Sequence, residues 1–144
     1  MKLMTRTKAS LIMIFNYITK KLSHTLLLFT LLTDDVFIKH IKGPLFFGST
    51  SDFQQLALQI PDTASTVIIR MGRMQYMDQS GLYAMEDVLR DLTIKGVRIL
   101  LVNVLNQPRY MMERIDIIPD LVPEEQIFSN FPKCLKGINT NINN

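Results

Sequence analysis

The sequence predicts an α/β fold: a mainly parallel, mixed sheet of about five strands, opened by a hairpin, with about four covering helices. Short runs of branched apolar residues alternate along the chain with longer segments whose apolar residues recur every three or four positions. Strands that alternate with helices pair in parallel, because each helix crosses over the sheet before the next strand begins. A length of 144 residues and an apolar content of 47% suffice for one domain with its own core.

Composition divides the chain into an arm, residues 1–33, a domain, residues 34–138, and a polar tail, residues 139–144, that we expect to be disordered. Five of the 16 basic residues precede the first acid, Asp34, which leaves 11 basic against 13 acidic residues in the remainder. The net charge of +3 therefore belongs to the arm. The domain lacks the basic excess that a nucleic-acid-binding surface needs, so we expect no nucleic-acid partner.

The arm contains two apolar runs, residues 11–18 and 26–32, with basic residues between them. Each run is shorter than the roughly 20 residues of a membrane-spanning helix. Basic residues beside apolar runs are typical of the cytoplasmic edge of a membrane segment. A helix packed on the domain or on a partner subunit explains the same residues equally well. The arm thus predicts either proximity to a membrane or packing on the domain or on a partner subunit, and in the last case a homodimer formed through the arm.

The domain opens with a predicted strand at residues 36–41, and Gly43-Pro44 then turns the chain into a second short strand at residues 45–47. Hydroxyl side chains at residues 49–51 can cap the helix that follows. The apolar face of that helix consists of Phe53, Leu56, Ala57 and Ile60.

The middle of the domain has the clearest pattern. A buried strand at residues 67–70 precedes the best helix, residues 82–94, which Lys95-Gly96 ends. The run at residues 98–104 is apolar throughout, as in a central parallel strand. The residues of the best helix that face the core are Leu82, Met85, Leu89 and Leu92.

Three further elements complete the prediction. A helix after Asn106-Gln107-Pro108 turns Met111, Met112 and Ile115 inward, and residues 126–128 form a short last strand. A final helix at residues 131–138 buries Phe131, Cys134, Leu135 and Ile138. The single cysteine excludes an internal disulfide, and we expect it to be a core residue.

The strongest candidate for a functional site is Asp78-Gln79-Ser80-Gly81, directly before Leu82. A helix start offers unpaired backbone N–H groups and the positive end of the helix dipole, which suit an anion, a phosphorylated hydroxyl or a partner's carboxylate. The structural interpretation is that Asp78 or Ser80 caps the helix and that Gly81 permits a tight turn.

Arginines form the second candidate. Arg73 precedes this turn and Arg109 opens the helix after the neighbouring strand, so both loops emerge at the carboxyl edge of the sheet, where ligands bind. With the helix start they could contact an anion or a nucleotide; ordinary solvated arginines are the alternative. No glycine-rich phosphate loop, metal-ligand spacing or recognisable nucleophile with its base is present. The sequence therefore predicts no cofactor, no metal, no catalytic residue and no enzyme.

Two motifs give the chain a family resemblance. Residues 41–48, Ile-Lys-Gly-Pro-Leu-Phe-Phe-Gly, and residues 77–82, Met-Asp-Gln-Ser-Gly-Leu after a buried strand, make residues 36–138 resemble a STAS domain. Bacterial anti-sigma-factor antagonists share this domain with the cytoplasmic C-terminal part of SulP-type (sulfate permease family) anion transporters. The Gly-Pro-Leu-Phe-Phe segment is more similar to the transporter branch. The basic arm agrees, because the domain of SulP-type proteins follows the last membrane helix directly.

The resemblance implies a non-catalytic regulatory and protein-interaction domain of a SulP-type sulfate or inorganic anion transporter, at the cytoplasmic face of the inner (plasma) membrane. Its partner would be the transporter's membrane domain or a cytosolic regulatory protein, bound through residues 78–82. The chain would be a domain of a larger protein or an independent product. The resemblance also implies an alternative, a stand-alone switch with Ser80 as phosphoacceptor two residues after Asp78, although Gln79 is larger than the residue usual between them. A phosphate there would add roughly −2 charge.

Overall fold

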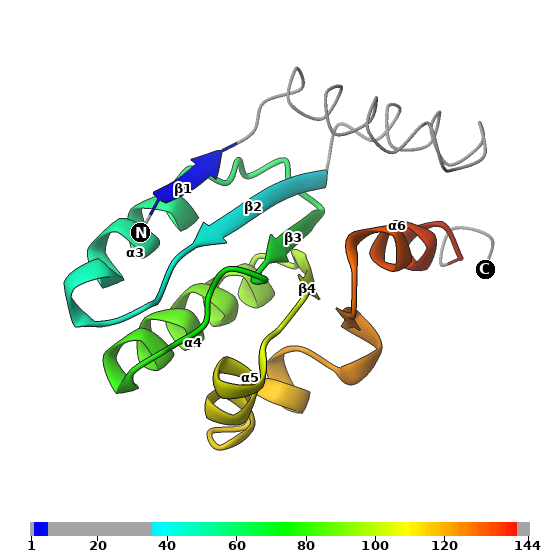
Figure 1. Cartoon of the computed structure of the whole chain (residues 1–144). Coiled ribbons are helices and arrows are strands. Elements are labelled where there is room, and N and C mark those ends of the chain that lie inside the picture. The colour runs from blue at the N-terminus through cyan, green and yellow to red at the C-terminus, as the bar shows by residue number, and fades with distance from the viewer. Residues whose placement is uncertain (1, 6–35, 141–144) are drawn as a thin grey trace.

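The computed structural model describes residues 2–5 and 36–140, which form one α/β domain (Figure 1). Its sheet has five strands in the order β1-β2-β3-β4-β5. β1 runs antiparallel to β2, and the four strands from β2 to β5 run parallel to one another. The predicted fold class, a mainly parallel mixed sheet with covering helices, is therefore confirmed. The strands are β1 (Lys2–Thr5), β2 (Val36–Lys42), β3 (Thr66–Arg70), β4 (Arg98–Val102) and β5 (Ile127–Phe128).

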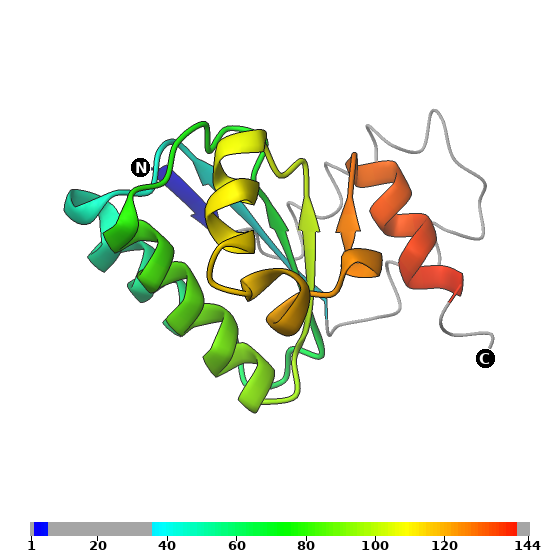
Figure 2. The ribbon, with the colours of Figure 1, turned by 90° about the horizontal axis from the view of Figure 1, so that it is seen from below.

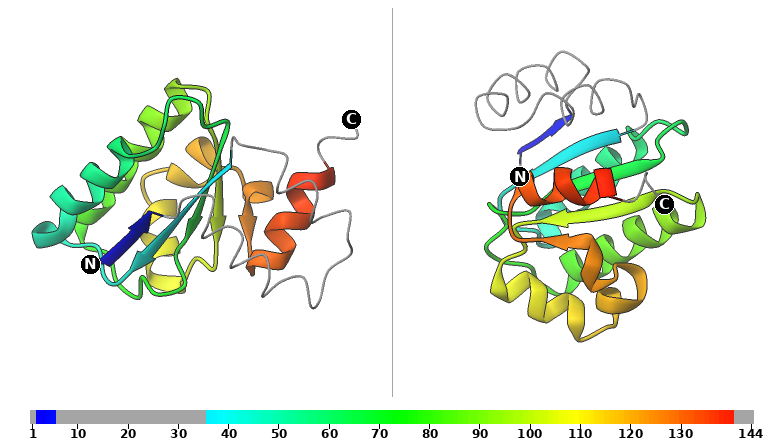
Figure 3. Two further views of the ribbon diagram at one scale, coloured as in Figure 1. Left: turned by 90° about the horizontal axis from the view of Figure 1, so that it is seen from above. Right: turned by 90° about the vertical axis from the view of Figure 1, so that its right-hand side faces the viewer.

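Helices cover both faces of the sheet, α3 and α4 on one side and α6 on the other (Figures 2 and 3). Side chains of successive strand residues point to opposite faces, so Val67 and Ile69 join the larger core beneath α3, α4 and α5, while Ile68 joins the smaller core beneath α6. The helices are α3 (Thr50–Leu58), α4 (Gln79–Ile94), α5 (Asn106–Glu113) and α6 (Phe131–Thr140). Short helical turns lie at η1 (Phe47–Ser49), η2 (Ile117–Leu121) and η3 (Glu124–Gln126).

The second strand predicted at residues 45–47 does not form. Leu45 makes a single parallel bridge with Met77, and the chain then enters the turn η1. The N–H of Leu45 donates to the carbonyl of Tyr76 (3.0 Å), and its carbonyl accepts from the N–H of Asp78 (3.1 Å). These contacts hold Leu45 beside the loop that precedes α4. The antiparallel partner of β2 is instead β1, which comes from the arm.

The other predictions about the arm, its apolar runs, its membrane proximity and the homodimer, lie outside the described residues. Helix α6 continues to Thr140. The prediction about the tail beyond that residue also lies outside the described residues. Within residues 2–5 and 36–140, no helix combines the length and the apolar character needed to cross a bilayer.

Helix α4 confirms its predicted core face, because Leu82, Met85, Leu89 and Leu92 are all buried. It begins at Gln79, three residues before the predicted start at 82. Its end agrees with the prediction: Lys95 is the C-cap, and Gly96 adopts a φ of +74°, a left-handed conformation that glycine tolerates best. The predicted buried face of α6 is also confirmed.

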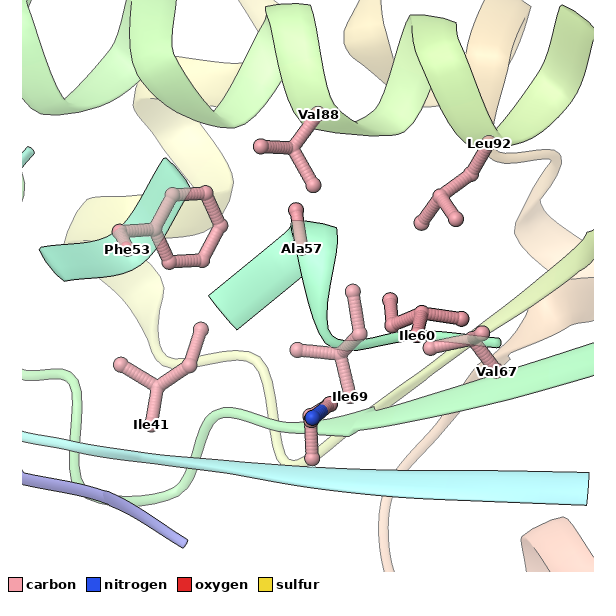
Figure 4. Close-up of a pocket in the computed structure, with 9 residues that line it drawn as sticks. Ile41, Phe53, Ala57, Ile60, Val67, Ile69, Val88 and Leu92 are labelled. Carbon is pink, nitrogen blue, oxygen red and sulfur yellow. The ribbon is translucent and has the colours of Figure 1, made fainter. Parts of the chain in front are cut away.

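Lys39 of β2 is a charged residue on the sheet face that carries the larger core. Lys39 is only 5% exposed. It lines a small apolar cavity of about 20 Å³, together with Ile41, Phe53 and Val88 among others (Figure 4). Desolvation lowers the pKa of Lys39 below its ordinary 10.5. Between the lowered value and 10.5 the unfolded chain binds more protons than the folded protein, so stability rises with pH through that window.

The substitution Lys39→Met is expected to raise the thermal midpoint near neutral pH by roughly 2–4 °C, because an apolar side chain of similar length replaces a desolvated charge. The variant should also lose part of the alkaline gain in stability. Thermal unfolding followed by circular dichroism at several pH values up to 10 measures both effects, with Lys95→Met, at an exposed site, as the control. A lower midpoint for Lys39→Met at every pH would show that the ammonium stabilises the fold.

Candidate interaction surface at the start of helix α4

The Asp78 carboxylate joins the start of α4 to the segment that follows β2. Its Oδ1 accepts a hydrogen bond from the N–H of Gly81 at 2.7 Å, the N-cap geometry predicted from the sequence. Its Oδ2 accepts from the N–H of Phe47 at 3.2 Å, at the beginning of η1. One side chain therefore fixes the starts of two helical elements, and only the first of these contacts was anticipated.

Gly81 is required by a close contact and not by the tight turn expected from the sequence. It lies inside the first turn of α4, and a Cβ atom at this position would stand 2.2 Å from the carbonyl oxygen of Leu45. Ser80, the predicted phosphoacceptor, is half-buried in the same turn, and Asp78 rather than Ser80 is the cap.

Gln107 on α5 holds the loop before α4 from the other side. Its Oε1 accepts from the N–H of Met77 at 2.9 Å, and its Nε2 donates to the carbonyl of Met77 at 2.8 Å. An amide side chain that satisfies both backbone groups of one residue replaces a strand partner. Sequence reasoning missed this role, although Gln107 lies in the first turn of the helix that follows β4, at the same sheet edge.

Exposed aromatic side chains occur in both of the segments that Asp78 joins. Phe47 is 79% exposed and Tyr83 is 50% exposed, and the hydroxyl of Tyr83 accepts from Nε2 of Gln79 at 2.7 Å. Aromatic residues are enriched at protein interfaces, where they supply large contact areas with few rotatable bonds. Sequence reasoning missed them, although paired phenylalanines in a loop after Gly-Pro were a usable signal. We call this region the α4 surface; its residues are Phe46, Phe47, Tyr76, Asp78, Gln79, Ser80 and Tyr83. Gly81 and Leu82, which were also expected to contact a partner, are buried.

Arg73 and Arg109 have different surroundings in the structure. Nε of Arg109 donates to Glu113 at 2.7 Å, and its NH2 group donates to Glu124 at 2.5 Å. The hydrogen bond to Glu124 is the main cause that raises the pKa of Arg109, and Glu113 adds to it. Arg109 therefore ties α5 to η3. Arg73 is exposed after β3 and lines a separate hollow, none of whose residues belongs to α4.

Neither a reactive thiol nor a metal cluster is found in the described part of the chain. Cys134 is fully buried, as expected, and burial raises the pKa of its thiol to about 12, against the smaller opposing effect of Arg98. The thiol therefore stays protonated at neutral pH, when it is a poor nucleophile. Among the described residues, no group of three or more His, Cys, Asp or Glu side chains could hold a metal ion.

A sequence profile of the STAS domain matches residues 30–133, so the chain belongs to the STAS domain family. The match includes the whole α4 surface. A protein of Bacillus subtilis (strain 168) described as a sulfate transporter, YvdB, is 25% identical over 75 residues, which are 51% of this chain and 14% of that protein. The chain therefore spans about a seventh of the length of this curated relative.

Solved structures with the same fold come from both branches of the family. A sulfate transporter family protein from Wolinella succinogenes superposes with a TM-score of 0.67 and 26% identity, covering 78% of this chain and 91% of that one. The STAS domain of a SulP transporter from Vibrio cholerae superposes with a TM-score of 0.63 and is 22% identical. The match covers 78% of this chain and 87% of that one. The unphosphorylated anti-sigma factor antagonist SpoIIAA superposes with a TM-score of 0.57 and is 15% identical. The match covers 76% of this chain and 92% of that one. The resemblance to STAS domains of SulP transporters and of antagonists is thus confirmed.

Proposed function

We propose that this chain is a regulatory domain that binds proteins and performs no chemistry, and that it acts at the cytoplasmic face of the inner membrane with a SulP-type anion transporter. The observation that carries the proposal is the α4 surface, where the two segments joined by the Asp78 carboxylate both carry exposed aromatic side chains. The descriptions of the relatives as sulfate transporters support the choice of partner. The transporter's membrane domain, a cytosolic regulator, or both would bind here.

The α4 surface suits protein binding because its backbone is fixed by hydrogen bonds and its exposed side chains include aromatic rings. Asp78 fixes Phe47 through its backbone, and Gln107 fixes the loop below, so little conformational entropy is lost when a partner binds. The exposed rings supply contact area, and the start of α4 favours negatively charged groups of the partner.

The double substitution Phe47→Ala and Tyr83→Ala should weaken binding to the transporter's membrane domain at least tenfold, because exposed aromatic residues are the usual anchors of an interface. Affinity is measured by biolayer interferometry with the detergent-solubilised membrane domain. The matched control is Ile94→Ala, which removes an apolar side chain that is 77% exposed at the opposite end of α4. Equal affinities for the wild type and the double variant would contradict the proposal.

The phosphorylation switch remains the second candidate, and it rests on the place of Ser80 in the first turn of α4, where a phosphate would be electrostatically favoured. The regulatory-domain account predicts that Ser80→Asp leaves partner affinity within about threefold, because the added charge lies at the favourable helix end. Ser80→Ala serves as the control in the same binding assay. A loss of binding for Ser80→Asp alone would favour the switch.

A further inference from the structure

A basic hollow lies at the carboxyl ends of β2 and β3, with a volume of about 210 Å³. Four of its seven lining residues carry basic side chains and none carries a carboxylate. The carboxyl ends of parallel strands are the usual place for ligands in α/β sheets. The residues that line the hollow are His40, Ile41, Lys42, Arg70, Gly72, Arg73 and Asn103.

Strand alternation explains how the sequence forms the hollow. Along β2 the side chains on the α6 face are first apolar, at Val36 and Ile38, and then basic, at His40 and Lys42. β3 shows the same change between Ile68 and Arg70, and His40 is the register partner of Arg70. The α6 helix packs on the apolar part of this face. The basic part therefore gathers at the strand ends.

Arg70 is held in a defined orientation. Its guanidinium lies over the ring of Phe131, 4.9 Å from the centroid, and its NH1 group donates to Nε2 of His40 at 3.2 Å. A planar guanidinium can bind two oxygens of one anion, and a fixed orientation reduces the entropy lost on binding.

Two loops close one side of the hollow. A Cβ atom at Gly72 would lie 3.2 Å from Cβ of Asn103, so glycine lets the loop after β3 approach the loop after β4. Asn103 adopts a φ of 57°, and its Nδ2 donates to the carbonyl of Ser129 at 2.7 Å. This contact fixes the neighbouring loop, and Arg73 follows Gly72 at the rim.

We propose that the basic hollow binds a tetrahedral oxyanion, sulfate or phosphate, either free or as part of a larger molecule. The volume of the hollow is several times the roughly 30 Å³ that one water occupies. This leaves room for the anion and for atoms attached to it. The hollow includes the α6 face of the sheet, whereas α4 packs on the other face, so the site goes beyond the protein-binding function proposed for the α4 surface.

Calorimetric titration of the full chain with sodium sulfate, and separately with sodium phosphate, tests the proposal at constant ionic strength. Saturable binding at one site per chain is expected for at least one of the two anions, with no saturable binding of chloride. Arg73→Gln and Lys42→Gln should each weaken it about tenfold, because each removes a charged contact. The matched controls are Arg114→Gln and Lys95→Gln, which neutralise exposed charges outside the hollow and should leave binding unchanged.

Two results would overturn the proposal: no saturable binding of either anion, or an equal loss in the hollow variants and in their controls, which would indicate diffuse charge attraction. Flotation with vesicles of phosphatidylcholine, with and without phosphatidic acid, distinguishes the source of the anion. Phosphatidic acid-dependent binding that Arg73→Gln abolishes and free phosphate inhibits identifies a lipid headgroup. Calorimetric binding without vesicle binding identifies a free anion, and both results support the site.

Discussion

Replacing Gly81 with alanine is expected to lower the free energy of unfolding by about 3 kcal/mol or more. The added Cβ would stand 2.2 Å from the Leu45 carbonyl oxygen, a backbone atom that cannot move aside as a flexible side chain can. Either α4 shifts away from the 45–47 segment, or the segment leaves its place beside the helix. Urea unfolding followed by circular dichroism measures the loss.

The control for this prediction is Gly96→Ala, at the other end of the same helix. A Cβ atom there meets nothing within 4 Å, but the φ of +74° is unfavourable for alanine, so the expected loss is only about 1 kcal/mol. A loss of less than about 1 kcal/mol for Gly81→Ala would show that the contact with Leu45 is absent in solution.

Replacing Asp78 with alanine is expected to lower the free energy of unfolding by about 2–3 kcal/mol, because two backbone N–H groups lose their acceptor. Those groups belong to Gly81 and Phe47, so the substitution should also loosen the α4 surface and weaken partner binding. Urea unfolding measures the stability, and binding to the membrane domain measures the second effect.

Asp78→Asn separates the two contacts. An asparagine oxygen can still cap the helix at Gly81, while its amide nitrogen cannot accept from the N–H of Phe47. We expect a stability loss of about 1 kcal/mol and reduced partner binding for this variant. Equal stability of Asp78→Ala and the wild type would rule out the bridging role of the carboxylate.

The sequence predicted best those elements whose apolar pattern is long or continuous. The face of α4 repeats over four turns, and the run that forms β4 is apolar throughout, so both were recognised from local periodicity alone. The strand predicted at residues 45–47 was wrong, since three apolar residues do not distinguish a strand from a turn held by tertiary contacts. β1 was missed because its four residues belong to a segment whose basic character dominated the interpretation.

At the α4 surface, the sequence predicted the cap but not its surroundings. N-capping by Asp78 follows from a local pattern, whereas the contact with Phe47 joins residues 31 positions apart. Glycine is needed at position 81 because of the close contact with the carbonyl oxygen of Leu45, which belongs to the same distant segment as Phe47. The sequence left open whether Arg109 contacts an anion or is an ordinary solvated arginine, and it did not predict either ion pair. One of its two carboxylate partners, Glu124, lies 15 positions further along the chain. Such partners become visible only when the fold places them side by side.

The most direct test of the protein-binding function is photo-crosslinking in membranes of the source cells, with a photoreactive phenylalanine derivative at position 83 of the native protein. Position 94, exposed at the other end of α4, receives the same probe as the control. The account predicts that position 83 crosslinks to the membrane-embedded domain of an anion transporter, to a cytosolic regulatory protein, or to both, and that position 94 crosslinks to neither. Equal crosslinking from both positions, or no crosslink to either kind of partner from position 83, would contradict it.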